Sequence, residues 1–321
     1  MGAPFELRTL RYFVAVAEEL HFGRAAARLH IAQPSLSVQI RKLERGLGVA
    51  LLVRTSRSVG LTPAGEVLLA EARILLADAE RVYAVTRGAG RQDRRAIVVG
   101  FQANAAAELT PRILGRYAER FPGRRVEMRS CDLTDPFAGL SDGSVDAAFV
   151  RLAFPVPDRL RAEVLFREPR VLGVRADSPL AGSGPVSIER LLDEPFVARR
   201  GPGPWRDYWL AADARDGHEV RIGAQITRLE ECLEAVLSGR GIGFTQMSTL
   251  RYYSRPGLTA VPVVDISPSD LAVAWRADDQ SEPVRDFVET ARVVAADFRV
   301  PGAIDRGEPL PAVLRSGGAE G

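Results

Sequence analysis

The chain has 321 residues, of which 46% are hydrophobic and 7% aromatic, enough to form the cores of two or three domains. No apolar run approaches the ~20 residues of a membrane-spanning helix, and the first ten residues lack the basic and apolar regions of a secretory signal. We therefore expect a cytoplasmic protein with no membrane contact, in which Cys131 and Cys232 are reduced thiols.

The net charge of +2 is unevenly distributed along the chain. Residues 1–95 carry 15 Arg or Lys against nine Asp or Glu, whereas the remainder carries 28 against 32. A basic head on a mildly acidic body is typical of a polyanion-binding module joined to a nearly neutral sensor.

The apolar spacing in the first 47 residues predicts three helices, over residues 7–19 and 22–30 and from Pro34 onward. The third helix has a buried stripe with spacings of four, three and four, at Leu36, Ile40, Leu43 and Leu47. Two helices joined by a short turn, the second with a polar outer side, favour a helix-turn-helix over an ordinary three-helix core. The outer side is suited to the major groove, with the candidate DNA contacts Gln33, Pro34, Ser35, Ser37, Val38, Gln39, Arg41 and Lys42.

Residues 51–62 predict two short strands around a polar turn. Arg54 and Arg57 project from this ribbon, which makes it a candidate wing that reaches the DNA backbone or the minor groove. A solvated turn is the alternative interpretation.

Thr62 and Pro63 predict the start of a long helix that runs to about Arg87. A narrow apolar seam follows one side of this helix, at Ala64, Leu68, Ala72, Leu75, Ala79 and Val82. We expect the seam to pack against a second copy of the chain, with packing on its own chain as the alternative.

Residues 7–76 resemble the DNA-binding region of LysR-type transcriptional regulators. The resemblance is carried by Leu10–Glu18, Ala25–Leu29, Gln33–Ser37, Gln39–Ile40, Leu43–Glu44, Leu47–Gly48, Leu51, Arg54 and Leu61–Gly65. It implies that the long helix forms an antiparallel homodimer, which pairs further into a homotetramer, with RNA polymerase as a further partner. Val38 departs from the family, which often has a polar or basic residue there; an apolar side chain can touch a thymine methyl, so the base preference at this step stays open.

Residues 96–300 alternate strand-like and helix-like segments, which predicts an α/β domain with a largely parallel sheet. Strands are predicted at 96–100, 125–129, 147–150, 170–175, 195–199, 241–245 and 270–275, and helices at 109–120, 135–141, 228–238 and 282–295.

The resemblance to the LysR family continues here, at Pro111–Leu114, Phe121–Gly123, Asp142–Asp146 and Gly239–Gly243. It implies a type 2 periplasmic-binding-protein-like domain of two α/β subdomains with an effector cleft between them. The expected organisation is a winged helix-turn-helix at 1–62, a linker helix and hinge at 63–95, an effector-binding domain at 96–300 and a flexible tail at 301–321. Within the effector domain, we expect subdomain I at 96–165 and 268–300 and subdomain II at 166–267.

Ligands of such sheets bind where strands end and helix N-termini present free N–H groups. Arginine at these places can hold a carboxylate, so we expect a small-molecule effector of that class. The candidate effector contacts are Gln102, Asn104, Thr134, Arg151, Arg199, Arg200 and Thr227. Thr227 with Glu230 also matches a capping box, which makes helix capping its alternative role.

No enzyme is expected, because His21, His30 and His218 are the only histidines and form no triad or metal-ligand pattern. Cofactors and metals are likewise not expected. Two alternatives to an effector-responsive regulator remain at this point: a redox-responsive regulator that uses Cys131 and Cys232, and a solute-binding protein. The widely spaced cysteines argue against the first, and the basic head and missing signal argue against the second.

Overall fold

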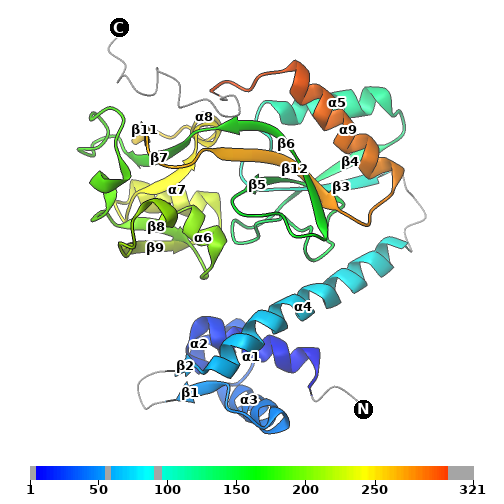
Figure 1. Cartoon of the computed structure of the whole chain (residues 1–321), viewed down its shortest axis with the longest axis vertical. Helices are drawn as coiled ribbons and strands as arrows, with labels where there is room; N and C mark the ends of the chain where they lie inside the picture. Colours follow the sequence, from blue (N-terminus) through cyan, green and yellow to red (C-terminus); the bar gives the residue numbers. More distant parts are fainter. Residues whose placement is uncertain (1–4, 55–58, 90–95, 303–321) are drawn as a thin grey trace. The chain divides into compact units, whose positions relative to one another are not determined.

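The computed structural model describes residues 5–54, 59–89 and 96–302, and the chain divides into two compact units (Figure 1). The N-terminal unit extends to residue 90, and the C-terminal unit holds nearly all of the remaining chain. Among the described residues, no helix is both long and apolar enough to span a membrane.

The N-terminal unit contains three short helices, a two-stranded ribbon and a long helix. Their bounds are α1 (Leu7–Glu19), α2 (Phe22–Arg28), α3 (Gln33–Leu47), β1 (Leu52–Arg54), β2 (Val59–Leu61) and α4 (Pro63–Ala89). The strands pair antiparallel. The predicted helices and strands of this unit are confirmed, although α2 ends at Arg28 and not at His30, and the turn at 55–58 lies outside the described residues. The predicted stripe of α3 forms part of the core, with Leu36, Ile40 and Leu43 buried and Leu47 half-buried.

The junction between the ribbon and α4 is held by Thr62, as its predicted capping role requires. Its hydroxyl donates to the carbonyl of Ala50 (2.8 Å) and accepts from the N–H of Gly65 (3.0 Å). Gly65 lies so close to the ribbon that an added Cβ would stand 2.1 Å from the carbonyl oxygen of Leu51. Only glycine therefore permits this approach of helix and strand.

The seam of α4 has two different environments. Ala64 and Leu68 pack against the core of the same unit and Ala72 is buried, whereas Leu75 and Val82 are 43% and 57% exposed. The expectation that the whole seam faces a second copy is thus wrong for its first half, which lies against α1 of its own chain.

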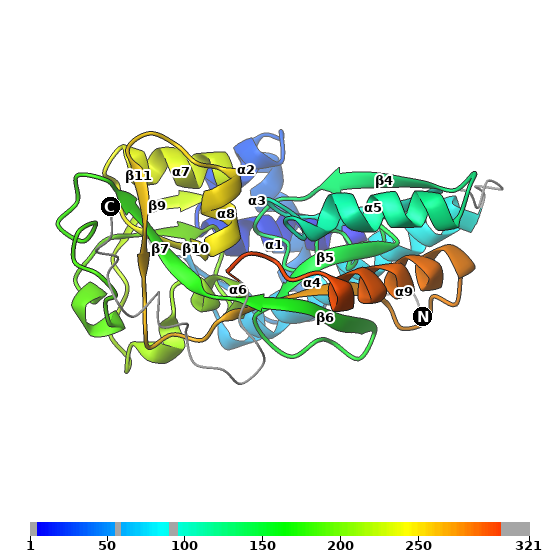
Figure 2. The ribbon, with the colours of Figure 1, turned by 90° about the horizontal axis from the view of Figure 1, so that it is seen from above.

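The C-terminal unit contains two lobes (Figure 2). The first lobe has the strand order β4-β3-β5-β12-β6, with α5 and α9 packed together. Its elements are β3 (Ala96–Phe101), α5 (Leu109–Arg120), β4 (Arg125–Ser130), β5 (Ala147–Leu152), β6 (Leu160–Glu168), β12 (Ser269–Arg276) and α9 (Glu282–Asp297).

The second lobe has an antiparallel sheet of order β10-β7-β11 and a parallel pair β8-β9. Its elements are β7 (Arg170–Arg175), η1 (Ile188–Leu191), β8 (Phe196–Arg199), α6 (Pro204–Tyr208), η2 (Ala212–Ala214), β9 (Ile222–Ile226), α7 (Leu229–Leu237), β10 (Gly243–Gln246), α8 (Met247–Tyr252) and β11 (Leu258–Pro262).

Two predictions for this unit are wrong. The sheets are mixed, not largely parallel: β3 runs parallel to β4 and β5, but β12 runs antiparallel to β5 and β6. Residues 135–141 form turns instead of a helix, because the Asp135 carboxylate accepts from the N–H groups of Phe137 and Gly139, and Ala138 and Gly139 have positive φ angles of 48° and 90°.

Candidate functional sites

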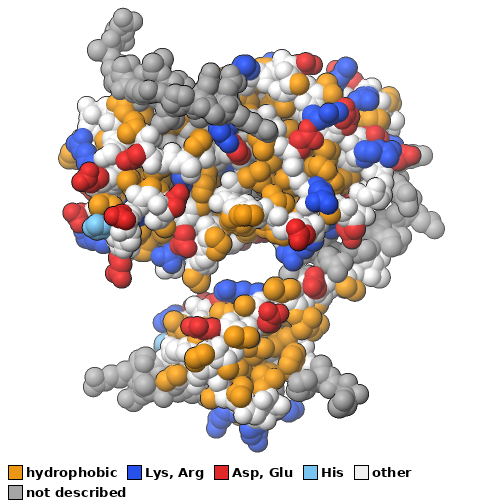
Figure 3. Space-filling model, in the orientation of Figure 1, with side chains coloured by type: hydrophobic (Ala, Val, Ile, Leu, Met, Phe, Trp, Pro, Cys, Tyr) orange, Lys and Arg blue, Asp and Glu red, His pale blue; other side chains and the backbone are white. Residues whose placement is uncertain are grey.

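The outward side of α3 carries most of the predicted DNA contacts. Gln33, Pro34, Ser35, Val38, Arg41 and Lys42 are exposed, whereas Ser37 and Gln39 are half-buried. Arg45, which the sequence analysis missed although it follows Arg41 by one turn, shares this side. In the space-filling view, Lys and Arg side chains gather on the side of the N-terminal unit that α3 forms (Figure 3).

Local contacts leave the positive charge of this helix available. Arg41 Nε donates to the carbonyl of Ser37 (3.3 Å) and Arg45 Nε to that of Arg41 (3.4 Å), so neither cation meets a carboxylate through these bonds. Glu44 instead accepts from the main-chain N–H groups of Leu51 and Leu52 (3.0 and 3.2 Å) and joins α3 to the ribbon. For Arg54 only the backbone, in β1, is described, and Arg57 lies outside the described residues.

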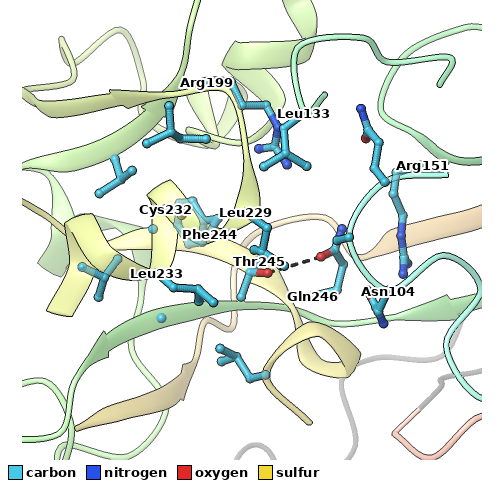
Figure 4. A pocket seen from close by; sticks show the side chains of 18 of the residues that line it. Asn104, Leu133, Arg151, Arg199, Leu229, Cys232, Leu233, Phe244, Thr245 and Gln246 are labelled. Carbon is cyan, nitrogen blue, oxygen red and sulfur yellow. Dashed lines mark hydrogen bonds between the residues drawn. The ribbon is translucent and has the colours of Figure 1, made fainter. Parts of the chain in front are cut away.

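A cavity lies between the two lobes of the C-terminal unit (Figure 4). Four of the predicted effector contacts line it: Gln102, Asn104, Arg151 and Arg199. The rest of the wall is largely apolar, a feature that the polar residues predicted from the sequence do not indicate. It consists of Ala103, Ala105, Leu133, Phe149, Gly173, Val197, Ile226, Leu229, Cys232, Leu233, Val236, Gly243, Phe244, Thr245, Gln246, Leu250, Leu258 and Leu271.

Three predicted contacts do not line this cavity. Thr134 and Arg200 are exposed. The Thr227 hydroxyl and main-chain N–H both donate to the Glu231 carboxylate (3.2 and 2.7 Å), which caps the start of α7. The capping partner of Thr227 is therefore Glu231 and not the predicted Glu230, which precedes it by one residue.

The side-chain amides of the two predicted contacts Gln102 and Asn104 form hydrogen bonds to other segments of the chain. Gln102 Nε2 donates to the carbonyls of Asp132 (2.7 Å) and Asp135 (2.5 Å). Asn104 connects the lobes, since its Nδ2 donates to Ser248 Oγ (3.0 Å) and its Oδ1 accepts from Thr249 Oγ1 (3.2 Å).

Arg151 lies at the end of β5 beside a buried carboxylate. Its Nη2 donates to Glu168 Oε1 at 2.6 Å, and Glu168, which is 0% exposed, also accepts from the main-chain N–H and the hydroxyl of Ser248, both at 2.7 Å. Arg151 is 8% exposed, and its Nη1 is buried without a hydrogen-bond partner in the described part of the chain. A buried N–H of this kind is costly unless an acceptor enters the cavity.

Arg199 ends β8 on the opposite lobe. Its guanidinium lies 4.1 Å from the ring centre of Trp209 and 5.1 Å from that of Trp205, within cation–π range. Burial lowers the pKa of Arg199 to about 9, so the group is still charged at neutral pH. Its Nε is also buried and has no hydrogen-bond partner among the described residues.

Leu133 joins the lobes through its main-chain N–H and carbonyl groups, so its apolar side chain gives no sign of this role in the sequence. Its N–H donates to the carbonyl of Thr227 (2.7 Å), and its carbonyl accepts from Trp205 Nε1 (2.7 Å). Nearby, Arg228 lies 3.5 Å from the Asp132 carboxylate.

Neither Cys131 nor Cys232 forms a disulfide bond with a described residue. Cys232 lines the cavity, and burial raises the pKa of its thiol to about 11, which leaves it protonated at neutral pH. Because the thiolate is the reactive form, Cys232 is not suited to rapid oxidation. Among the described residues, no cluster of His, Cys, Asp and Glu could hold a metal ion.

Residues 7–66 match the family model described as "Bacterial regulatory helix-turn-helix protein, lysR family", and residues 90–296 match "LysR substrate binding domain". The chain belongs to the LysR family of transcriptional regulators. It is therefore a DNA-binding regulator with an effector-binding domain, not an enzyme.

Relatives of the whole chain support this membership. The uncharacterized HTH-type transcriptional regulator YnfL of Escherichia coli is 39% identical over 288 residues, which cover 88% of this chain and 96% of YnfL. Full-length BenM, a regulator from Acinetobacter baylyi, is similar in structure, with a TM-score of 0.53, 31% identity and coverage of 91% of this chain and 97% of BenM. CbnR in complex with its target DNA has a TM-score of 0.50 and 25% identity, with coverage of 91% and 100%.

Proposed function

We propose that α3 reads operator DNA in the major groove. The supporting observation is its outward side, which combines exposed amide and hydroxyl groups near the N-terminus with Arg41, Lys42 and Arg45 farther along. Amides and hydroxyls address base edges, and cations meet phosphates. Residues 1–62 then form the DNA-binding domain with β1-β2 as its wing, and Arg54 and Arg57 are assigned to the DNA backbone or minor groove.

Gln33→Ala tests this assignment. Because a glutamine can pair with adenine through two hydrogen bonds, the variant should lose about 1–3 kcal/mol of affinity for a specific site and little for nonspecific DNA. Binding is measured by mobility shift with duplexes that the wild-type chain selects from a random library, at fixed salt. Gln225→Ala, which changes an exposed glutamine on β9 of the C-terminal unit, serves as the matched control. Equal losses on both kinds of DNA for Gln33→Ala would show that Gln33 is not a reader.

The assembly that we propose is a homodimer through α4, paired further into a homotetramer. The support is an exposed apolar series along this helix: Val67, Ile74, Leu75 and Val82 are 43–67% exposed. A helix of 27 residues is about 40 Å long, long enough to bury this series against a second copy. Residues 63–95 then form the linker, with RNA polymerase as a further partner in the cytoplasm.

The effector that we propose is a small carboxylate with an apolar body. Two buried guanidinium N–H groups without a described acceptor, from Arg151 and Arg199, line the same cavity. A carboxylate offers them charged acceptors, while Leu229 and Phe244 can cover the apolar part. Residues 96–300 form the effector domain, with subdomains at 96–165 plus 268–300 and at 166–267. We further propose that the two subdomains adopt two relative arrangements, and that the effector shifts the regulator by binding one arrangement more tightly than the other.

Arg199→Met should weaken carboxylate binding roughly 10- to 150-fold, since a hydrogen bond to a charged group contributes about 1.5–3 kcal/mol. A panel of small aliphatic and aromatic carboxylates is screened by thermal shift, and the binders are measured by calorimetry beside their uncharged amides. Arg200→Met is the matched control, because Arg200 is adjacent but exposed and does not line the cavity. Amides that bind as tightly as the acids would contradict the proposal.

A further inference from the structure

Val38 occupies the middle of the outward side of α3. The buried residues Leu36, Ile40 and Leu43 define the inner side of the helix, and at 100° per residue Val38 points almost opposite to them. The Val38 side chain is 51% exposed, and it is apolar, whereas its outward neighbours Arg41 and Lys42 are charged.

No contact with the described residues of the N-terminal unit explains a valine at this position. A half-exposed side chain contributes little to the core, and the β-branch makes valine a poorer helix former than the polar residues around it. The surface beside Val38 is hollowed and is lined by Arg41, Glu44, Arg45, Gly48, Val49 and Ala50. The lining holds two cations, Arg41 and Arg45, and one carboxylate, Glu44, which already accepts from the N–H groups of Leu51 and Leu52. An apolar side chain at the edge of this hollow fits a ligand that is anionic overall and apolar at one point.

The C5-methyl of thymine is the apolar group that projects farthest from a base edge into the major groove of DNA, whereas guanine and adenine present hydrogen-bond donors and acceptors there. Valine has no hydrogen-bonding atoms in its side chain, so it can neither pair with guanine nor with adenine. We propose that Val38 selects a thymine in each half-site by contact with its methyl group. This inference rests on the proposed entry of α3 into the major groove.

The test uses the full-length chain and a duplex that it selects from a random library. Each thymine of this duplex is replaced in turn by uracil, which removes the methyl group and keeps the base pair. One thymine per half-site should show about fourfold weaker binding, the value for one buried methyl, and replacement in both half-sites should weaken it about fifteenfold. The other thymines should show no such loss.

Val38→Ser should abolish this difference between thymine and uracil, with helix content checked by circular dichroism. Val293→Ser is the matched control, because Val293 is an exposed valine on α9 (36%) and the uracil effect should persist there. A preferred duplex at which every uracil is silent, or a Val38→Ser variant that keeps the effect, would overturn this inference alone. Selection that returns no preferred sequence would overturn the proposed function together with it.

Discussion

Glu168→Leu is expected to lower the free energy of unfolding of the C-terminal unit by about 3–5 kcal/mol, because it removes one partner of a buried ion pair. Glu168 is fully buried and accepts from Arg151 and twice from Ser248. Without the carboxylate, the Arg151 guanidinium stays in the interior with neither Nη2 nor Nη1 paired. The first lobe also loses the two hydrogen bonds that Glu168 accepts from Ser248 of α8, although those between Asn104 and α8 remain.

Urea unfolding of the full-length chain measures this effect. Glu234→Leu is the control, since its pair with Arg255 (3.1 Å) is exposed and worth at most about 1 kcal/mol. The double variant Arg151→Met/Glu168→Leu should be more stable than Glu168→Leu, as it no longer buries an isolated charge. A Glu168→Leu midpoint equal to that of Glu234→Leu would show that the pair does not stabilise the fold.

The second large effect is expected for Gly65→Ala in the N-terminal unit. The new Cβ would stand 2.1 Å from the carbonyl oxygen of Leu51, a backbone atom that cannot rotate away. Helix α4 must therefore move from the ribbon, at a cost of about 3 kcal/mol, the upper end for overpacked sites. Because the ribbon and α3 are joined through Glu44, DNA affinity should fall as well.

Gly115→Ala provides the opposite case. Gly115 lies in α5, and an added Cβ there meets no atom within 4 Å. This variant should stabilise the C-terminal unit by about 0.5–1 kcal/mol, the helix preference of alanine over glycine. Thermal unfolding of both variants measures these opposite changes in stability. A Gly65→Ala protein as stable as the wild type would contradict the close approach of α4 to the ribbon at Gly65.

The N-terminal unit could be predicted from local patterns because its core is made by short helices with clear periodicity. The stripe from Leu36 to Leu43 and the cap at Thr62 depend on residues a few positions apart. The partner of the first half of the α4 seam cannot be predicted in this way, since periodicity shows that a side of a helix is buried but not what buries it.

The C-terminal unit is harder to predict from sequence, because its sheets are formed by strands that lie far apart in the chain. Strand β12 returns after the whole second lobe to pair antiparallel with β5 and β6, and no local pattern encodes that direction. In the cavity, Arg151 and Arg199 could be found as cations at strand ends. Thr227 and Arg200 could not be excluded, because one residue along the chain separates a lining side chain from an exposed one.

The main-chain connection through Leu133 has a consequence for how the lobes separate. Its N–H and carbonyl bind Thr227 and Trp205 of the second lobe at the same length, 2.7 Å. Separation of the lobes at this point requires both hydrogen bonds to break. The indole N–H of Trp205 exchanges a protein acceptor for water in that step, which makes its fluorescence an intrinsic signal of lobe opening.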